Sequence, residues 1–219
     1  ALEAEIADIE VEGVMERLPL GKSAGPDGIP NGVYKGNPKY FGAKLGAVLR
    51  EAVARGKLPP SFMKGDISVL YKKGDRDDPR NYRPITLLQN AYRIFTRIQA
   101  RRLERVVHEF VSECQKGFVP HAFIAECSML MNLIEAYMND DAHPDRGGIM
   151  LFLDMEKAFD RVSYEVLMSA AEAVGFGPTF LTTLGMMYNT ARPPKRRIYA
   201  NGFYSDWFEI KSGVAQGCP

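Results

Sequence analysis

The chain has 219 residues, 46% of them hydrophobic, which is enough to bury a core in one large domain or in two lobes. Its formal net charge is +1, so the overall charge does not indicate a nucleic-acid partner, and such evidence must come from local clusters. The longest apolar run, residues 149–153, is too short to cross a membrane, and three cysteines without C-x-x-C spacing indicate a reduced, intracellular protein of the nucleus or cytoplasm.

The spacing of apolar residues predicts an α+β fold. Helices are expected over residues 2–18 and 39–55, followed by a strand over 66–71 and a polar loop over 72–83. Further helices are expected over 88–107 and 122–138, then a buried strand over 149–154 and helices over 163–174 and 178–188. Two short strands, at about 197–199 and 207–210, flank a turn at Asn201-Gly202. This order is not the regular alternation of a βαβ protein.

A carboxylate follows the expected buried strand. The apolar residues 149–153 end in Asp154, which places this side chain at the exposed end of the strand. A carboxylate is costly to desolvate alone and is normally held by a cation or by hydrogen-bond donors. Mg²⁺ suits the position because it binds carboxylate and phosphate oxygens together. From the residues alone, Asp154 as a cap of the next turn is an equally good interpretation.

The residues around Asp154 are similar to a known motif. Residues 153–160, Leu-Asp-Met-Glu-Lys-Ala-Phe-Asp, resemble the first palm motif of reverse transcriptases from non-LTR (LINE-type) retrotransposons. The resemblance implies that Asp154 binds two catalytic Mg²⁺ ions and that Phe159 is the steric gate that rejects a ribose 2′-hydroxyl. We expect Asp160 to cap the helix that follows.

Three other segments resemble motifs of the same family, in the same order. Residues 22–30 contain its Gly-Pro-Asp-Gly signature, and residues 81–88 resemble its fingers motif, which implies that Arg83 binds the incoming triphosphate. The turn before it offers Lys72 and Lys73 as candidates for a second phosphate contact. Residues 213–219 resemble the motif G-[VI]-x-Q-G-C-P, which implies that Gln216 and Gly217 pack against nucleotide and template.

Two basic clusters are candidate nucleic-acid contacts. Four arginines recur every four residues on the expected helix after the fingers motif: Arg93, Arg97, Arg101 and Arg105. Like charges at this spacing repel each other, so either a phosphate backbone or nearby glutamates must offset them. A second cluster, residues 195–197, could contact primer or template, but an ordinary charged strand edge is the favoured interpretation.

The resemblance implies a right-hand polymerase with fingers and a partial palm, whose antiparallel palm sheet is incomplete. Residues 1–146 would form the fingers and the fingers–palm helices, and residues 147–219 the first part of the palm, before a [YF]-x-D-D hairpin. The implied activity is RNA-directed DNA synthesis: two-metal phosphoryl transfer from dNTPs to a DNA primer on an RNA template. We expect the sequence to be an excerpt that is inactive by itself. The alternative is a decayed or domesticated element that only binds nucleic acid or protein, and the oligomeric state is not indicated.

Overall fold

The structure is a computed structural model that describes residues 2–140, 147–188, 191–215 and 217–218. The chain forms two compact units. Unit 1 consists of Ala1–Arg102 and Lys157–Pro219, and unit 2 consists of Leu103–Glu156. These units reflect packing, so the boundary between polymerase subdomains at residues 146 and 147 stays a prediction.

Unit 1 combines helices with a sheet, which confirms the predicted α+β class. Its core includes the fully buried side chains of Met15, Leu49, Ile94 and Phe95. Its helices are α1 (Asp8–Glu16), α2 (Asn31–Gly36), α3 (Pro38–Arg55), most of α4 (Asn90–Glu104), α6 (Tyr164–Val174) and α7 (Pro178–Met187). Short 3₁₀ turns are η1 (Pro60–Met63), η2 (Pro79–Asn81) and η4 (Ala158–Arg161). The predicted right-hand polymerase architecture stays a prediction.

The helix ends follow local signals in the sequence. The side chain of Asn37 accepts a hydrogen bond from the Tyr40 N–H, and Pro38 occupies the first turn of α3. The helix ends at Gly56 in the left-handed region, with φ of 61°. By contrast, α1 begins at Asp8 rather than at residue 2, so the predicted first helix is too long at its N-terminal end.

The sheet of unit 1 is mixed. Its strands are β1 (Lys64–Tyr71), β2 (Tyr82–Leu88), β3 (Lys195–Ala200), β4 (Phe203–Tyr204) and β5 (Phe208–Glu209). The order is β2-β1-β3-β4, with β5 also paired to β3. Strands β1 and β3 are parallel, whereas the other pairs are antiparallel. Asn201 and Gly202, both at positive φ, form the predicted two-residue turn between β3 and β4.

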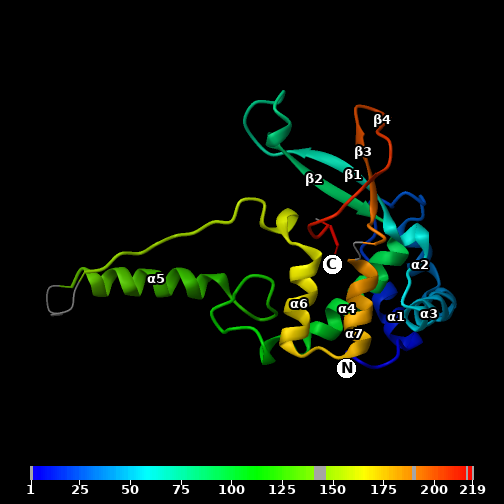
Figure 1. Cartoon of the computed structure of the whole chain (residues 1–219), viewed down its shortest axis with the longest axis horizontal. Coiled ribbons are helices and arrows are strands. Elements are labelled where there is room, and N and C mark those ends of the chain that lie inside the picture. Colours follow the sequence, from blue (N-terminus) through cyan, green and yellow to red (C-terminus); the bar gives the residue numbers. More distant parts are fainter. Residues whose placement is uncertain (1, 141–146, 189–190, 216, 219) are drawn as a thin grey trace. The chain divides into compact units, whose positions relative to one another are not determined.

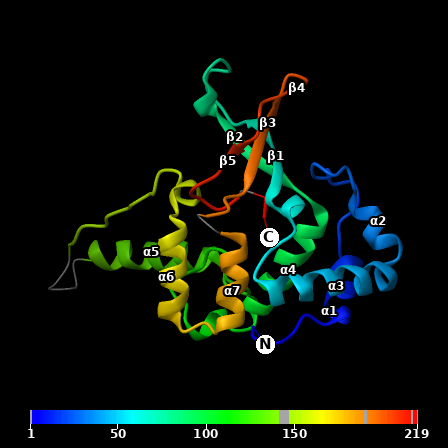
Figure 2. The same ribbon diagram turned by 45° about the vertical axis from the view of Figure 1, so that its right-hand side comes forward.

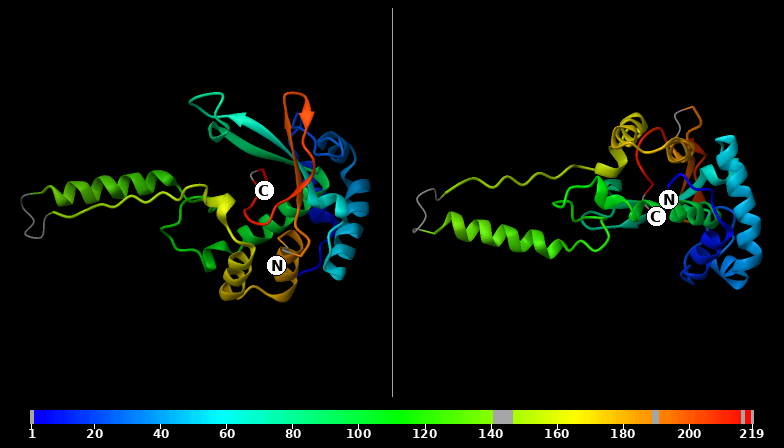
Figure 3. Two further views of the ribbon diagram at one scale, coloured as in Figure 1. Left: turned by 45° about the horizontal axis from the view of Figure 1, so that its top comes forward. Right: turned by 90° about the horizontal axis from the view of Figure 1, so that it is seen from below.

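The hairpins of unit 1 extend away from its helices. Figures 1, 2 and 3 show the β1–β2 and β3–β4 hairpins extending to the same side, with α6 and α7 next to each other at the other side. Strand β2 was not predicted because Pro84 and the charged residues before it hide the alternation of its side chains.

Unit 2 does not contain the predicted strand. It holds η3 (Val107–Glu109) and α5 (Ile124–Met138), the latter as predicted, but residues 147–156 adopt no strand. A strand that is apolar on both faces needs neighbours at both edges, and the described part of unit 2 supplies none. Ile149, Leu151 and Leu153 are therefore 96%, 77% and 85% exposed. No helix in the described part of the chain is long and apolar enough to cross a membrane.

Candidate nucleotide site

The tip of the β1–β2 hairpin presents the predicted phosphate-binding residues. The rings of Tyr71 and Tyr82 meet edge-on with centroids 5.6 Å apart, and the Tyr71 hydroxyl donates to the Gly74 carbonyl over 2.7 Å. The Lys72 N–H donates to the carbonyl opposite it in the hairpin. These contacts hold the backbone of the tip, and the side chains of Lys72 and its neighbour Lys73 are exposed there.

Arg83 is exposed on β2, where it pairs in register with Leu70. Side chains alternate along a strand, so Arg83 lies on one face of the sheet and Thr86 on the other. No carboxylate in the described ranges forms an ion pair with Arg83, Lys72 or Lys73. These three cations are therefore available to an anionic ligand.

The 3₁₀ turn η4 carries Phe159 and is tied to the loop of residues 212–218. The Val214 N–H donates to the Phe159 carbonyl over 2.9 Å, and the Gly213 N–H donates to the Val162 carbonyl over 2.7 Å. The Phe159 side chain is 48% exposed. The loop thus fixes the backbone of Phe159 while its ring keeps an accessible surface.

Asp160 does not cap the helix that follows, so this prediction is wrong. The N-cap of α6 is Ser163, and no side chain makes a capping hydrogen bond there. Asp160 lies within η4 instead, where its carbonyl faces the hydroxyl of Ser212 at 3.5 Å. The short turn η4 ends before α6 begins, which leaves the Asp160 carboxylate too early in the chain to cap α6.

The same loop reaches β2 through Gly217. At this residue φ is +115°, and a Cβ atom would lie 2.7 Å from the Thr86 carbonyl oxygen. A side chain here would be both strained and in contact with backbone, so glycine is required. The next residue, Cys218, packs against the core, and burial raises the pKa of its thiol although hydrogen bonds with Thr96 and Tyr92 lower it. Gln216 lies outside the described residues.

A pocket of roughly 210 Å³ lies between this loop and the sheet, entirely within unit 1. Its lining includes Thr86, Tyr164, Tyr188 and the buried Arg196, whose Nη1 donates to the carbonyls of two neighbouring residues. Burial lowers the pKa of Arg196, while the nearby tyrosines raise it. The pocket opens on the Thr86 face, so Arg83 is on the opposite side of the sheet. The structure thus joins Phe159 and Gly217 to β2 but does not place Arg83 in the same pocket.

Asp154 lies in the irregular segment of unit 2 and is exposed. It does not end a strand, so the predicted basis for its position is wrong. The described residues contain no group of three or more His, Cys, Asp or Glu side chains that could hold a metal ion. A pair of Mg²⁺ ions needs several carboxylates, and Asp154 alone does not fit that requirement.

The sequence model for reverse transcriptase (RNA-dependent DNA polymerase) matches residues 70–219, well over half of the chain. The chain belongs to the reverse transcriptase family. This confirms the family predicted from the four motifs.

The chain is similar to proteins of transposons and of another mobile element. Over its full length it is 32% identical to the transposon TX1 uncharacterized 149 kDa protein of Xenopus laevis, of which it covers 16%. Over 97% of its length it is 27% identical to the probable RNA-directed DNA polymerase from transposon BS of Drosophila melanogaster, of which it covers 23%. Over 95% of its length it is 25% identical to the RNA-directed DNA polymerase from mobile element jockey of the same species, covering 22% of it. The chain therefore spans less than a quarter of each of these relatives.

The predicted arginine row is not one exposed stripe. Arg93 is partly buried, and burial followed by the nearby Arg97 lowers its pKa. Arg101 donates to the Gly13 carbonyl over 3.3 Å. Helix α4 ends at Glu104, so Arg105 lies beyond the helix, in unit 2. Nucleic-acid binding by these four residues stays a prediction.

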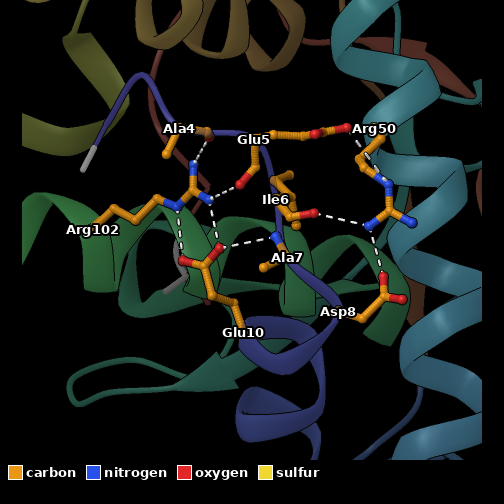
Figure 4. A network of polar contacts seen from close by, with 8 residues as sticks. All are labelled: Ala4, Glu5, Ile6, Ala7, Asp8, Glu10, Arg50 and Arg102. Carbon is orange, nitrogen blue, oxygen red and sulfur yellow. Dashed lines mark hydrogen bonds and ion pairs between the residues drawn. The ribbon is translucent and has the colours of Figure 1, made fainter.

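Two other arginines hold the N-terminal segment, and the sequence analysis missed them both. Arg102 is 3% exposed and donates to the Glu10 carboxylate over 2.6 and 3.0 Å and to the carbonyls of Ala4 and Glu5. Arg50 of α3 donates to the Asp8 carboxylate over 2.6 Å. Figure 4 shows the two guanidinium groups on opposite sides of this segment. The signal that the sequence offered was the pair of acidic residues in the first turn of α1, Asp8 and Glu10.

The second basic cluster lies within the sheet. Strand β3 pairs with β1 on one side and with β4 and β5 on the other, so residues 195–197 are not at a strand edge, and the favoured interpretation is wrong. Arg196 points to the helices and is buried, whereas Lys195 and Arg197 lie on the other face. The signal that the sequence offered was the set of aromatic residues that follows the cluster, up to Trp207.

Proposed function

We propose that the chain forms the nucleotide-selecting part of an RNA-directed DNA polymerase, which extends a DNA primer with dNTPs on an RNA template during retrotransposition. The observation that supports this most is the connection of two motifs within unit 1. The residue at the gate position, Phe159, is hydrogen-bonded through its backbone to Val214, and Gly217 of the same loop packs on the Thr86 carbonyl. Motifs that are 58 positions apart, Phe159 and Gly217, therefore form one assembly with a fingers strand.

The gate role of Phe159 has a direct physical basis. A ring that stands against the 2′ position of a sugar leaves no room for an extra oxygen, and it offers that oxygen no hydrogen-bond partner. Discrimination of this kind requires the ring to stay in place when a ribonucleotide binds. The hydrogen bond from Val214 to the Phe159 carbonyl and the adjacent bond from Gly213 to Val162 supply that rigidity.

The triphosphate would be bound by the hairpin of β1 and β2. Lys72, Lys73 and Arg83 are exposed there, and no ion pair within the described ranges neutralises them. A guanidinium group offers paired donors to phosphate oxygens, whereas a lysine provides a point charge. The hairpin would have to bring Arg83 to the nucleotide from the face of β2 that is opposite to Thr86.

Asp154 would supply one carboxylate to the two Mg²⁺ ions predicted from the family motif. When bound, such ions stabilise the entering and leaving oxygens of phosphoryl transfer. Among the described residues there is no group of three or more side chains that could hold such ions. The other ligands would come from elsewhere in the complete protein.

The proposal is tested with the complete polypeptide that contains this chain, in primer extension on an RNA template. Phe159→Val is expected to lower the preference for dNTPs over rNTPs by about 10- to 100-fold, because one excluded hydroxyl is worth about 1–3 kcal/mol. Phe123→Val, which changes a 67% exposed ring at the start of α5, is the matched control and should leave the preference unchanged. An unchanged preference in Phe159→Val would refute the gate role.

A second pair of variants tests the acidic residue. Asp154→Asn is expected to abolish synthesis, whereas Glu156→Gln, two residues away in the same exposed segment, should retain it. Synthesis by Asp154→Asn at the unmodified rate would contradict the assignment. If the unmodified polypeptide binds primer and template but does not extend the primer, the alternative of a decayed element that only binds is correct.

A further inference from the structure

One face of the sheet in unit 1 gathers aromatic and basic side chains from three strands. The register pairs Asp66 of β1 with Arg197 of β3, and Tyr199 of β3 with Tyr204 of β4. Since alternate residues of a strand share a face, these four side chains lie on the same side. It is the side opposite to the buried Arg196, and therefore the side that faces away from the pocket and the helices.

A β-bulge adds Trp207 to this face. Tyr204 pairs with Tyr199 and Phe208 pairs with Arg196, so three residues of the β4–β5 segment stand opposite two residues of β3. The extra residue is the mark of a bulge, which redirects a side chain. The Trp207 ring lies 4.7 Å from the Arg197 guanidinium carbon, so the bulge directs it onto the face of Arg197.

Arg197 holds two rings in fixed positions. Its guanidinium carbon is 3.8 Å from the Tyr204 ring centre, which is a cation–π contact like that with Trp207. Its Nε and Nη2 donate to the two Asp66 carboxylate oxygens over 2.7 and 3.3 Å, and the hydrogen bond to Asp66 raises the pKa of Arg197. The planar guanidinium group of Arg197 is held in place by Asp66, so it can position the two rings. Its charge is already paired with Asp66, so it does not serve as a phosphate-binding group.

The rings remain accessible although they are ordered. Tyr199, Tyr204 and Trp207 are 42%, 52% and 37% exposed. The Nζ atom of Lys64 lies 5.3 Å from the Trp207 ring centre, and the Lys64 side chain is exposed. Exposed rings that are gathered into one patch, rather than scattered singly over the surface, are typical of an interaction site.

The charge on this face is positive. We call it the aromatic–basic face and define it by Lys64, Arg83, Lys195, Arg197, Tyr199, Tyr204 and Trp207. Four cations there stand against two carboxylates, Asp66, which binds Arg197, and Glu209, whose oxygen is 3.8 Å from the Lys195 nitrogen. A ligand that combines negative charge with flat apolar rings complements this surface.

We propose that the aromatic–basic face binds single-stranded nucleic acid, with unpaired bases stacked on Tyr199, Tyr204 and Trp207 and a phosphate near Lys64. Proteins that bind single strands combine a basic surface with aromatic rings, because every base has a face that can stack. In a duplex the base faces are stacked on each other, so a duplex can interact with this surface only through its phosphates. This proposal rests on the proposed function in one respect: the RNA template of the polymerase would have to reach the sheet as a single strand.

The test uses an intrinsic reporter. Trp207 is the single tryptophan of the 219-residue chain, so its fluorescence reports on the aromatic–basic face directly. Unpaired oligonucleotides of mixed sequence, one of RNA and one of DNA, are expected to quench it in a saturable way. A blunt duplex of the same length is expected to bind at least about tenfold more weakly, since it lacks accessible base faces. Equal binding of duplex and single strand, or saturable binding without a change in Trp207 emission, would overturn the proposal.

Variants separate stacking from charge. Tyr204→Ala should weaken single-strand binding by roughly 5- to 150-fold, the usual effect of removing one stacking ring, whereas Tyr204→Phe should stay within about twofold. Tyr40→Ala is the matched control, because Tyr40 is 55% exposed on α3, close to the 52% of Tyr204. Lys64→Ala should reduce the slope of log K against log salt by about 0.7, the value for one phosphate on a single strand.

The variants also distinguish this proposal from the proposed function. Circular dichroism at increasing temperature shows whether Tyr204→Ala remains folded; if it is not, Tyr204→Phe and Lys64→Ala still decide the outcome. Equal affinities of Tyr204→Ala and Tyr40→Ala would overturn the face as a binding site, whatever the polymerase activity. A complete polypeptide that binds through this face but does not extend primers would instead count against the proposed function alone.

Discussion

Replacement of Arg102 should destabilise unit 1 far more than replacement of an exposed arginine. The Arg102 guanidinium makes two hydrogen bonds to Glu10 and one each to the carbonyls of Ala4 and Glu5, and the residue is 3% exposed. Arg102→Met keeps much of the side-chain volume but leaves Glu10 and two carbonyls without this donor. Removal of one partner from a buried ion pair costs about 3–5 kcal/mol, because the other charge remains desolvated.

The magnitude can be refined from the surroundings of Glu10. The Glu10 side chain is 28% exposed, so water can partly solvate it when Arg102 is removed, which places the cost at the lower end, about 3 kcal/mol. In the double variant Arg102→Met/Glu10→Met no charge is left, and the loss should be smaller than in Arg102→Met alone. A coupling energy of about 1–3 kcal/mol between the two residues is expected.

Urea unfolding followed by circular dichroism measures these effects. With m of about 2–3 kcal/mol per molar urea, a loss of about 3 kcal/mol lowers the midpoint by about 1–1.5 M. The matched control is Arg55→Met on α3, whose partner Glu51 lies one turn away; both side chains are largely exposed, at 72% and 59%. That variant should cost no more than about 0.5 kcal/mol. If Arg102→Met and Arg55→Met shift the midpoint equally, the buried ion pair is not a determinant of stability.

Two further predictions concern backbone strain and pH. Gly217→Ala should cost about 1–3 kcal/mol in thermal unfolding, because it adds a contact with the Thr86 carbonyl to an unfavourable φ. Gly28→Ala, at φ of +70° with open space around it, should cost less, and equal losses would exclude the contact as the cause. Glu3 accepts hydrogen bonds from the N–H groups of Thr179 and Phe180 at the start of α7. Burial raises the pKa of the Glu3 carboxyl group, but the hydrogen bonds lower it by more, so the pKa lies below its ordinary value of 4.5. The stability that this contact contributes is therefore complete above pH 4.5 and is lost as the pH falls. Glu3→Gln should thus lower the melting temperature only at the higher pH values. A difference in melting temperature between the variant and the unmodified protein that does not change with pH would contradict this.

Local signals in the sequence predicted most of the helices well, but not the short helix α2 (Asn31–Gly36). The end of α3 at Gly56 and the extents of α5, α6 and α7 follow from apolar spacing, proline and glycine, which act within a few residues. The turn at Asn201-Gly202 was predicted for the same reason, because both residues tolerate positive φ. These features depend little on what the chain contacts elsewhere.

Features that depend on distant partners were not predictable in the same way. The apolar run that ends in Asp154 has the composition of a buried strand, but a strand forms only where another strand supplies hydrogen bonds. The role of Arg102 was not predicted, because nothing in its local sequence reveals that Glu10 and two carbonyls lie against it. The motifs predicted that Phe159 and Gly217 are functional, but the hydrogen bond from Val214 that connects their segments comes from the fold.

The parallel pairing of β1 with β3 has a consequence for biosynthesis. Unit 1 is assembled from two stretches of chain separated by all of unit 2, and Lys64 pairs in register with Lys195. A ribosome must therefore add 124 further residues after Tyr71, the end of β1, to reach Lys195, the start of β3 (195 − 71), and until then β1 has only β2 as a neighbour. Until then the exposed edge of β1 is open to pairing with other chains, so we expect nascent polypeptides stalled before β3 to depend on chaperones, and completed ones to be free of that dependence.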